Sequence, residues 1–486
     1  MRDRGSIPPE ILRFFKMFPG QTLLIKGRPG TGKTILSLEI LREICEEKNG
    51  LYVSTRVTHE KLYSLFPWIK RIVPEKNIVN ATPKKINDAL SSAELTDREF
   101  DFDTALSFFR MLYEDAEEMN NPVVVIDSWD AILESPKLRD RKVSFTQSIC
   151  NFCHEVKTHL ILISETDTLT DLDYVVDGIV TLLDSNVYGD DSEETIGHAG
   201  SRTLRKIRID KLRGVERRRK FYTFTLQNGR FKYFPVRCRM RISEVKPLPD
   251  IDEAHRSSGI KDFDKVSGGL MRGGLTLFTM DHGVGLRYIP FLDQIAINLS
   301  LKGIGIVRLR SVGSVLNEDY NLIKQHNGIY FYKPEAWITW RLERLFPSVE
   351  EYGKFLESIR KSRIDLLEFS LMEFRKEYLN FLEKIKRRHS AIVEFLGLDT
   401  LEILYGAENT LKLLDEAIDR ASRNNEVLIA IAKKGMKSIR MITQLAATHF
   451  VFKDILGNLF IYGEHPRTAL YNVSSDKRGI RLTPIV

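Results

Sequence analysis

Residues 27–34 have the types and the spacing of a phosphate-binding loop. Their sequence, GRPGTGKT, fits the pattern G-x-x-x-x-G-K-[ST] in full. The glycines let the backbone turn tightly, so that successive N–H groups point at phosphate oxygens, and the start of the following helix adds partial positive charge. Lys33 is expected to reach the β- and γ-phosphates of ATP, and the Thr34 hydroxyl to bind Mg²⁺. The predicted ATP-binding residues are Gly27, Arg28, Pro29, Gly30, Thr31, Gly32, Lys33 and Thr34.

An acidic residue at the end of a buried strand should complete the Mg²⁺ site. Residues 123–126 form a continuous apolar run, as a parallel strand covered on both faces requires, and Asp127 follows directly. Asp127 is therefore the predicted partner of Thr34 at the metal ion. The alternative role for Asp127 is that of an acidic cap on the next helix.

Apolar strand patterns alternate with amphipathic helix patterns through the first half of the chain. The strand patterns include HLILIS at residues 159–164 and a predicted strand pair at residues 174–183. Such alternation predicts an α/β fold with a mostly parallel sheet flanked by helices. Ser164 and Glu165 stand at the end of their strand, where they are predicted to act as sensors of the bound nucleotide.

The first half resembles the KaiC-like branch of the RecA superfamily of P-loop ATPases. The segments GRPGTGKT, VVVIDSWDAI, YVVDGIVTLL and RIDKLRG come in the order of that branch and cover about residues 1–240. The opening, IPPEILRFFKMFPGQTLLIK, and the later LYVSTRV look most like the archaeal gas-vesicle regulator D (GvpD-type) group. The resemblance implies that ATP and Mg²⁺ bind between neighbouring subunits of a homo-oligomer.

The resemblance also implies contacts from one subunit to the nucleotide of the next. In KaiC-like proteins a lysine and an arginine two residues apart reach across to the neighbour's phosphates, and Lys211 and Arg213 are the matching positions here. Alternate residues of a strand point to one face, so both side chains suit one phosphate group. The alternatives for this pair are a solvated basic hairpin and a nucleic-acid patch.

One position departs from the KaiC-like pattern. The strand after the first helix should end in a pair of glutamates that polarise the attacking water, but Arg56 and Val57 stand there. Loss of a general base typically costs about 10²–10⁴-fold in rate. Glu60, one helical turn later, is the remaining candidate for that role. The sequence therefore predicts ATP binding with slow hydrolysis, or a nucleotide switch.

The second half repeats the first with an altered loop. Residues 259–278 resemble the entry to a KaiC-like domain, and MDHGVGLR follows at the loop position. Leu286 stands in the place of the lysine and Arg287 in the place of the hydroxyl residue, so neither phosphate neutralisation nor Mg²⁺ binding is expected. Asp399 is expected at the end of a strand, where Asp127 stands in the first half.

Two tandem domains are therefore expected, the second of them degenerate. The predicted limits are residues 1–243 for the ATP-binding domain, 244–258 for a linker rich in proline and charge, and 259–486 for the degenerate domain. The leading prediction is an ATP-binding regulatory protein that signals to an unidentified protein partner through its second domain.

Composition restricts the partners and the location. The chain of 486 residues is 43% hydrophobic and 29% charged, lacks an apolar run of the roughly 18 residues that a membrane span needs, and shows no signal-peptide pattern. A cytoplasmic protein without membrane contact is expected. Its four cysteines make no disulfide framework, and Cys150 and Cys153 are expected to pack in a core.

A DNA-repair ATPase is the alternative function. The net charge of +7 and the basic run at residues 202–220 allow a nucleic-acid partner. Single-strand binding usually adds aromatic stacking to basic charge, and only Phe221 and Tyr222 follow this run. DNA is therefore an allowed but less favoured partner.

Overall fold

A computed structural model gives the fold of the chain, which divides into two compact units. The first comprises Met1–Pro235 with Pro484–Val486, and the second comprises Val236–Thr483. The structure describes residues 5–45, 49–81, 102–113, 122–136, 138–188, 201–236, 245–311, 328–332, 365–476 and 479–486. The expected end of the first domain at residue 243 lies outside these ranges, and the domain limits expected from the sequence stay a prediction.

The first unit is built on a sheet of nine described strands in the order β3-β2-β4-β5-β1-β6-β7-β8-β9. Neighbours from β3 to β6 are parallel, and neighbours from β6 to β9 are antiparallel. The strands are β1 (Thr22–Lys26), β2 (Gly50–Ser54), β3 (Ile78–Asn80), β4 (Val123–Asp127), β5 (His159–Ser164), β6 (Gly178–Tyr188), β7 (Ser201–Leu212), β8 (Phe221–Thr225) and β9 (Lys232–Tyr233). The helices are α1 (Pro9–Met17), α2 (Lys33–Ile44), α3 (His59–Leu65), α5 (Phe102–Tyr113), α6 (Trp129–Leu133), α7 (Lys142–Glu155) and α8 (Leu172–Val175).

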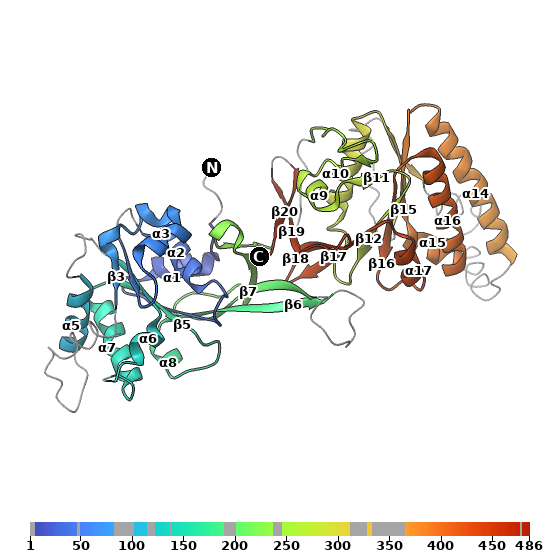
Figure 1. The fold of residues 1–486 in the computed structure, drawn as a ribbon. Coiled ribbons are helices and arrows are strands. Elements are labelled where there is room, and N and C mark those ends of the chain that lie inside the picture. The colour runs from blue at the N-terminus through green and yellow to red at the C-terminus, as the bar shows by residue number, and fades with distance from the viewer. Residues whose placement is uncertain are drawn as a thin grey trace. The chain divides into compact units, whose positions relative to one another are not determined.

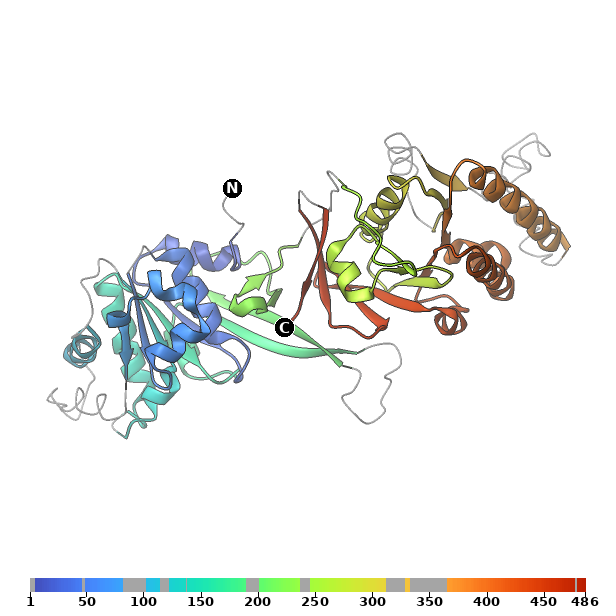
Figure 2. The same cartoon turned by 45° about the horizontal axis from the view of Figure 1, so that its top comes forward.

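Side chains of the central strand β1 enter two cores on the two faces of this sheet, because successive residues of a strand point to opposite faces. Leu23 and Ile25 pack with α1 and α2 in one core, whereas Leu24 packs with α5, α6 and α7 in the other. Figure 1 and Figure 2 show these helices on opposite sides of the sheet. Every residue of β1 is buried, as the apolar run predicts.

Two buried cysteines belong to the second of these cores. Cys150 and Cys153 lie on α7, are both free thiols and pack among apolar neighbours. Burial raises the pKa of the Cys150 thiol to about 12, so it stays protonated at neutral pH. Both cysteines therefore serve in packing.

The second unit repeats the strand order of the first. The nine described strands of its large sheet run β14-β13-β15-β16-β12-β17-β18-β19-β20, so β12 takes the place of β1, and β10 and β11 form a separate pair. β12 pairs in parallel with β16 and β17, and the β17–β18 and β18–β19 pairs are antiparallel. The predicted fold class, two α/β units with mostly parallel sheets flanked by helices, is confirmed.

The elements of the second unit follow the same alternation. Its strands are β10 (His255–Arg256), β11 (Leu270–Met271), β12 (Leu275–Met280), β13 (Gly305–Leu309), β14 (Ile329–Tyr332), β15 (Ile392–Gly397), β16 (Leu428–Lys433), β17 (Thr448–Ile455), β18 (Asn458–His465), β19 (Tyr471–Asp476) and β20 (Gly479–Pro484). Its helices are α9 (Lys261–Ser267), α10 (Ile289–Ser300), α14 (Asp365–Lys386), α15 (Leu398–Tyr405), α16 (Ala407–Asn424) and α17 (Ile439–Leu445). None of the described helices in either unit combines the length and the apolar composition needed to cross a membrane.

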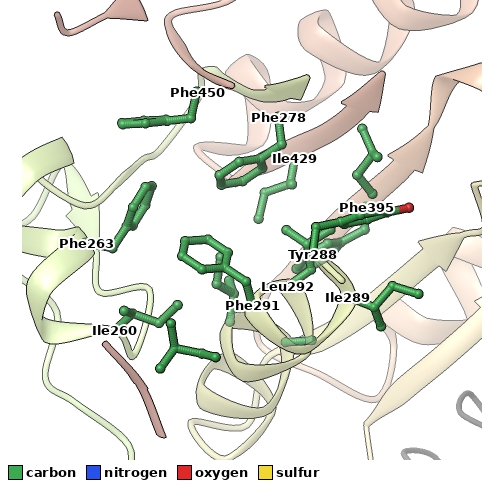
Figure 3. Close-up of a cluster of buried hydrophobic side chains, with 14 of the residues drawn as sticks. Ile260, Phe263, Phe278, Tyr288, Ile289, Phe291, Leu292, Phe395, Ile429 and Phe450 are labelled. Carbon is green, nitrogen blue, oxygen red and sulfur yellow. The ribbon is translucent and has the colours of Figure 1, made fainter. Parts of the chain in front are cut away.

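Aromatic rings fill the core on one face of the second sheet. Phe263 from α9 and Phe291 from α10 meet Phe278 and Phe450 from the central strands (Figure 3). The ring centroids of Phe263 and Phe450 are 4.7 Å apart, and those of Phe263 and Phe291 are 5.3 Å apart in a T-shaped pair. Such edge-to-face contacts add to the stabilisation that comes from burying the rings.

Two expectations about local structure are wrong. Residues 174–183 hold one strand, β6, and not a strand pair, because the chain before it forms α8. Leu172 and Val176 are buried four residues apart while Tyr174 is exposed, which is the spacing of a helical turn. The sequence also predicts Asp399 at a strand end, but β15 ends at Gly397 and Asp399 lies in the first turn of α15.

Asp250, in the segment expected as a linker, is bound to the second unit. Its carboxylate lies 2.7 Å from Lys302 Nζ, 3.1 Å from Arg272 Nη2 and 3.3 Å from Arg256 Nη1. A single acidic side chain therefore fixes this segment beside β10, α10 and the turn that leads into β12.

Candidate nucleotide-binding site

The predicted phosphate-binding loop joins β1 to α2, the arrangement that its function requires. β1 ends at Lys26, and α2 begins at Lys33. Gly32 caps the helix with a φ of 97°, a conformation that favours glycine. A Cβ atom on Gly27 would lie 2.7 Å from the Leu182 carbonyl oxygen, so this position has no room for a larger residue. The backbone thus needs glycine where the sequence has it.

Lys33 lies across the loop. Its ammonium group donates hydrogen bonds to the carbonyl oxygens of Gly27, at 2.6 Å, and Arg28, at 2.9 Å. Burial lowers the pKa of Lys33, and the nearby carboxylates of Glu165, Asp127 and Asp130 act in the opposite direction. Three carboxylates therefore lie near the Lys33 ammonium group.

The predicted Mg²⁺ ligands are brought together by β4 and α2. The Thr34 hydroxyl donates to Asp127 Oδ2 at 2.6 Å, although the two residues are 93 positions apart in the chain. Asp127 is the last residue of β4, as predicted. The described residues hold no cluster of three or more His, Cys, Asp or Glu side chains that could bind a metal alone. The Thr34 hydroxyl and the Asp127 carboxylate offer adjacent oxygens, the kind of ligand that Mg²⁺ uses together with phosphate and water.

Tyr52 is a member of this site that the sequence did not reveal. Its hydroxyl, on β2, donates to the same Asp127 oxygen at 2.7 Å. Burial raises the pKa of Tyr52 well above its usual value, and the adjacent Asp127 carboxylate raises it further, so the side chain remains a hydrogen-bond donor. The sequence offers one indication of this role: Tyr52 lies within the apolar run that forms β2, the neighbour of β4.

The predicted sensor residues lie at the same edge of the sheet. Asp130 Oδ2 accepts hydrogen bonds from the Glu165 backbone N–H, at 2.6 Å, and from the Ser164 hydroxyl, at 3.1 Å. The Glu165 carboxylate pairs with Arg56, with an Nη1–Oε1 distance of 2.5 Å. Asp130 and Arg56 are thus further members of the site, next to the residues predicted from sequence.

Glu60 is not brought into this cluster. Its carboxylate is 77% exposed on α3 and lies 3.4 Å from the Thr58 hydroxyl and 3.8 Å from His59 Nε2. Arg56 lies two residues after the end of β2 and pairs with Glu165. Glu165 is therefore the carboxylate that contacts the residue in the place of the missing glutamates.

Lys211 and Arg213 lie at the opposite edge of the sheet from the loop of their own chain. The end of β7 pairs with Gly178 at the start of β6, beside the first residues of β1, whereas the loop follows the last residue of β1. Lys211 Nζ donates to the carbonyl oxygens of Asp173 and Val176, at 3.0 and 2.6 Å, and Arg213 pairs with Asp177 at 3.0 Å. The structure does not bring the pair to its own phosphate-binding loop.

Of the two aromatic residues after the basic run, Tyr222 is buried. Tyr222 is 6% exposed and donates a hydrogen bond to Glu10 at 2.7 Å. Within the run, Arg208 pairs with Asp210 at 2.6 Å, and Arg217 donates to the backbone carbonyl of Asp210, also at 2.6 Å. These contacts give the segment a role in the sheet of the first unit.

The altered loop of the second unit is closed by Arg287. Its guanidinium group donates to the carbonyl oxygens of Gly283 and Gly457, each at 2.9 Å, and pairs with Asp454. Beside this loop lies a cleft of about 610 Å³. Its wall includes Asp399, which accepts from the Ser311 hydroxyl at 2.7 Å and pairs with Lys433 at 2.9 Å. Arg287 therefore fastens the altered loop to Asp454 and Gly457.

Comparisons with known proteins agree with this geometry. Residues 11–205 match the model of the P-loop domain of the GvpD gas vesicle protein. Protein GvpD2 of Halobacterium salinarum is 31% identical over 285 residues, which are 56% of this chain and 54% of that protein. Protein GvpD1 of the same organism is 29% identical over 279 residues, 55% of this chain and 49% of that protein.

A third relative shares a lower identity with the chain. The circadian clock oscillator protein KaiC of Picosynechococcus sp. is 26% identical over 295 residues, 57% of this chain and 52% of that protein. The chain therefore spans about half the length of the curated relatives that it matches. The loop between β1 and α2, the Thr34–Asp127 pair and these matches all point to one family. The first unit therefore carries a P-loop domain similar to that of the GvpD gas vesicle proteins and, at lower identity, to KaiC.

Proposed function

We propose that the first unit binds ATP with Mg²⁺ and that the bound nucleotide controls a regulatory action of the protein. The observation that carries this proposal is the Thr34–Asp127 contact of 2.6 Å beside a complete phosphate-binding loop. The names of the relatives support regulation, since one of them is a circadian clock oscillator protein. Mg-ATP binding by the wild type and its loss in Lys33→Ala test the proposal.

Slow hydrolysis or switching fits this site better than rapid turnover. Arg56 occupies the position at which the KaiC-like pattern has its water-polarising glutamates, and Glu60 points away into solvent. Removal of a well-placed general base costs about 10²–10⁴-fold in rate. The protein would therefore remain in its ATP-bound state for long enough to act as a signal.

Asp127→Asn is expected to raise the Mg²⁺ concentration that ATP binding requires by about 10–100-fold, the usual cost of removing a carboxylate that holds a metal's ligands. The amide keeps the shape of the side chain but loses its charge. The measurement is a Mg²⁺ titration of the ATP-induced shift in melting temperature. Asp140→Asn, a change at an exposed position outside the site, serves as the matched control. Equal Mg²⁺ midpoints for Asp127→Asn and wild type would contradict the metal assignment.

We further propose that ATP holds a homo-oligomer together through Lys211 and Arg213. Their position at the sheet edge opposite their own loop supports contact with the nucleotide of a neighbouring subunit. Lys211→Ala and Arg213→Ala are expected to reduce ATP-dependent assembly, measured as mass by light scattering. Arg218→Ala, an exposed arginine in the same segment, should assemble as the wild type does. Unchanged assembly of the first two variants would remove the cross-subunit role.

The second unit is proposed to pass the nucleotide state of the first to a protein partner. It has the same strand order as the first unit, but Arg287 closes its loop and Leu286 replaces the lysine. A unit of this kind keeps the shape of a nucleotide-binding domain without the charges that bind Mg-ATP. DNA is not favoured as the partner, because Tyr222 is buried in the sheet.

A further inference from the structure

We infer that Glu165 is the catalytic carboxylate that orients the attacking water for ATP hydrolysis in the first unit, and that Arg56 is its positioning residue. The inference rests on the proposed binding of Mg-ATP at residues 27–34. In the KaiC-like pattern the catalytic glutamates follow the strand that corresponds to β2. The inference instead places the catalytic carboxylate at the end of β5.

The backbone around Glu165 is fastened directly to the phosphate-binding loop. β5 lies next to β1, with Ser164 beside Lys26 in the register of the two strands. The Gly27 N–H donates to the carbonyl oxygen of Thr166 at 2.9 Å, and Arg28 Nε pairs with Asp167 at 3.0 Å. These two contacts tie the segment that carries Glu165 to the phosphate-binding loop, so the position of Glu165 relative to the loop is fixed.

Two neighbours fix the direction of Glu165. Asp130 Oδ2 accepts the Glu165 backbone N–H at 2.6 Å, which holds the main chain at the end of β5. Arg56 binds both carboxylate oxygens, with distances of 2.5 Å to Oε1 and 3.3 Å to Oε2. β2 and β5 lie on either side of β4 in the sheet. The Arg56–Glu165 ion pair therefore bridges the end of β4, which carries Asp127.

The other two carboxylates near Lys33, those of Asp127 and Asp130, already accept hydrogen bonds from neighbouring groups. Asp127 accepts from Thr34 and Tyr52, as the metal-side acid should. Asp130 accepts from the hydroxyl and the backbone N–H at the end of β5. Glu165 is one-third exposed, at 34%, and its described contacts are those to the exposed Arg56. Glu165 thus has a partly exposed carboxylate near Lys33, and a water molecule can reach it.

The chemistry needs one base that is held in place. The Glu165 carboxylate accepts a hydrogen bond from water as the water oxygen attacks the γ-phosphorus. The bond from that phosphorus to the bridging oxygen breaks, ADP leaves with the electron pair, and the water proton passes by way of Glu165 to the products, ADP and phosphate. A carboxylate has about four lone-pair sites, so Glu165 can accept a hydrogen bond from water while Arg56 holds it in place.

The test compares Glu165→Gln with Glu60→Gln, the same change at the other candidate base. Glu165→Gln is expected to lower kcat by about 10²-fold or more while KM and the Mg-ATP melting shift stay unchanged. Glu60→Gln should match the wild type, because its carboxylate faces solvent. Arg56→Lys keeps the charge but not the two-oxygen fork, so it is expected to give an intermediate kcat with the KM of the wild type.

Chemical rescue separates a base from a structural carboxylate. Exogenous formate is expected to restore part of the turnover of Glu165→Ala and to leave Lys33→Ala inactive. Wild-type turnover in Glu165→Gln, a failure of formate to raise Glu165→Ala, or Mg-ATP binding without measurable hydrolysis in the wild type would each overturn the inference and leave the proposed binding intact. A wild type that does not bind Mg-ATP would instead contradict the proposed function itself.

Discussion

Lys33→Ala is expected to abolish the stabilisation that Mg-ATP gives to the first unit. A ligand at about 100 times its dissociation constant stabilises the folded state by roughly 2.7 kcal/mol, and a variant that does not bind gains nothing. Lys33 is the loop cation, and its ammonium group lies 2.6 Å from the Gly27 carbonyl oxygen, across the path of a phosphate. The measurement is a melting curve of each protein with and without Mg-ATP.

Lys61→Ala is the matched control for this experiment. Lys61 is an exposed lysine on α3 in the same unit, so its loss removes one charge without touching the loop. Lys61→Ala should show the full shift of the wild type. A shift of equal size in Lys33→Ala, or none in the wild type, would rule out ATP binding at this loop. Melting without ligand checks that Lys33→Ala is still folded.

Trp129→Ala is expected to destabilise the first unit by about 3–5 kcal/mol, the usual cost of truncating a large core aromatic. The side chain is fully buried directly after the metal-side strand β4. Its ring stacks on Phe145 at 5.6 Å between centroids, and its indole N–H donates to the Thr146 hydroxyl at 3.1 Å. The measurement is the free energy of unfolding in urea, followed by circular dichroism. The transition that belongs to the first unit is the one that Mg-ATP shifts in the wild type.

Tyr174→Ala supplies the comparison for that prediction. Tyr174 is an aromatic residue of the same unit that is 71% exposed. Surface substitutions of this kind usually change stability by no more than about 0.5 kcal/mol. Similar losses for Trp129→Ala and Tyr174→Ala would mean that the core under β4 does not hold the site in place. A large loss for Trp129→Ala alone ties the stability of the first unit to the packing beneath Asp127.

The phosphate-binding loop and Asp127 could be predicted because their signals are local. A glycine pattern between an apolar strand and an amphipathic helix is complete within about 20 residues, and it needs no knowledge of the rest of the fold. The run at residues 123–126 ends at Asp127 in the structure as it does in the pattern. The Thr34–Asp127 contact then follows, since parallel strands end at one edge of a sheet.

The errors arose where local patterns were ambiguous. The apolar residues around Tyr174 fit a strand as well as a helical turn, and short runs of this kind do not distinguish the two. Asp399 was predicted to end a strand, but it lies two residues beyond the end of β15. The apolar run continues from β15 into α15, so the sequence does not mark the boundary between them. Both cases concern element ends, which depend on what the neighbouring elements leave room for.

The sequence by itself determined that this protein has a phosphate-binding loop, a second loop without the required lysine, and two α/β units. These properties follow from residue types and from spacings of a few positions. The tertiary structure decided which side chains meet at the loop. Arg56 and Glu165 are 109 positions apart, and Tyr52 and Asp127 are 75 apart. Such contacts depend on the strand order β2-β4-β5-β1, which is set by packing across the whole sheet and by no single segment.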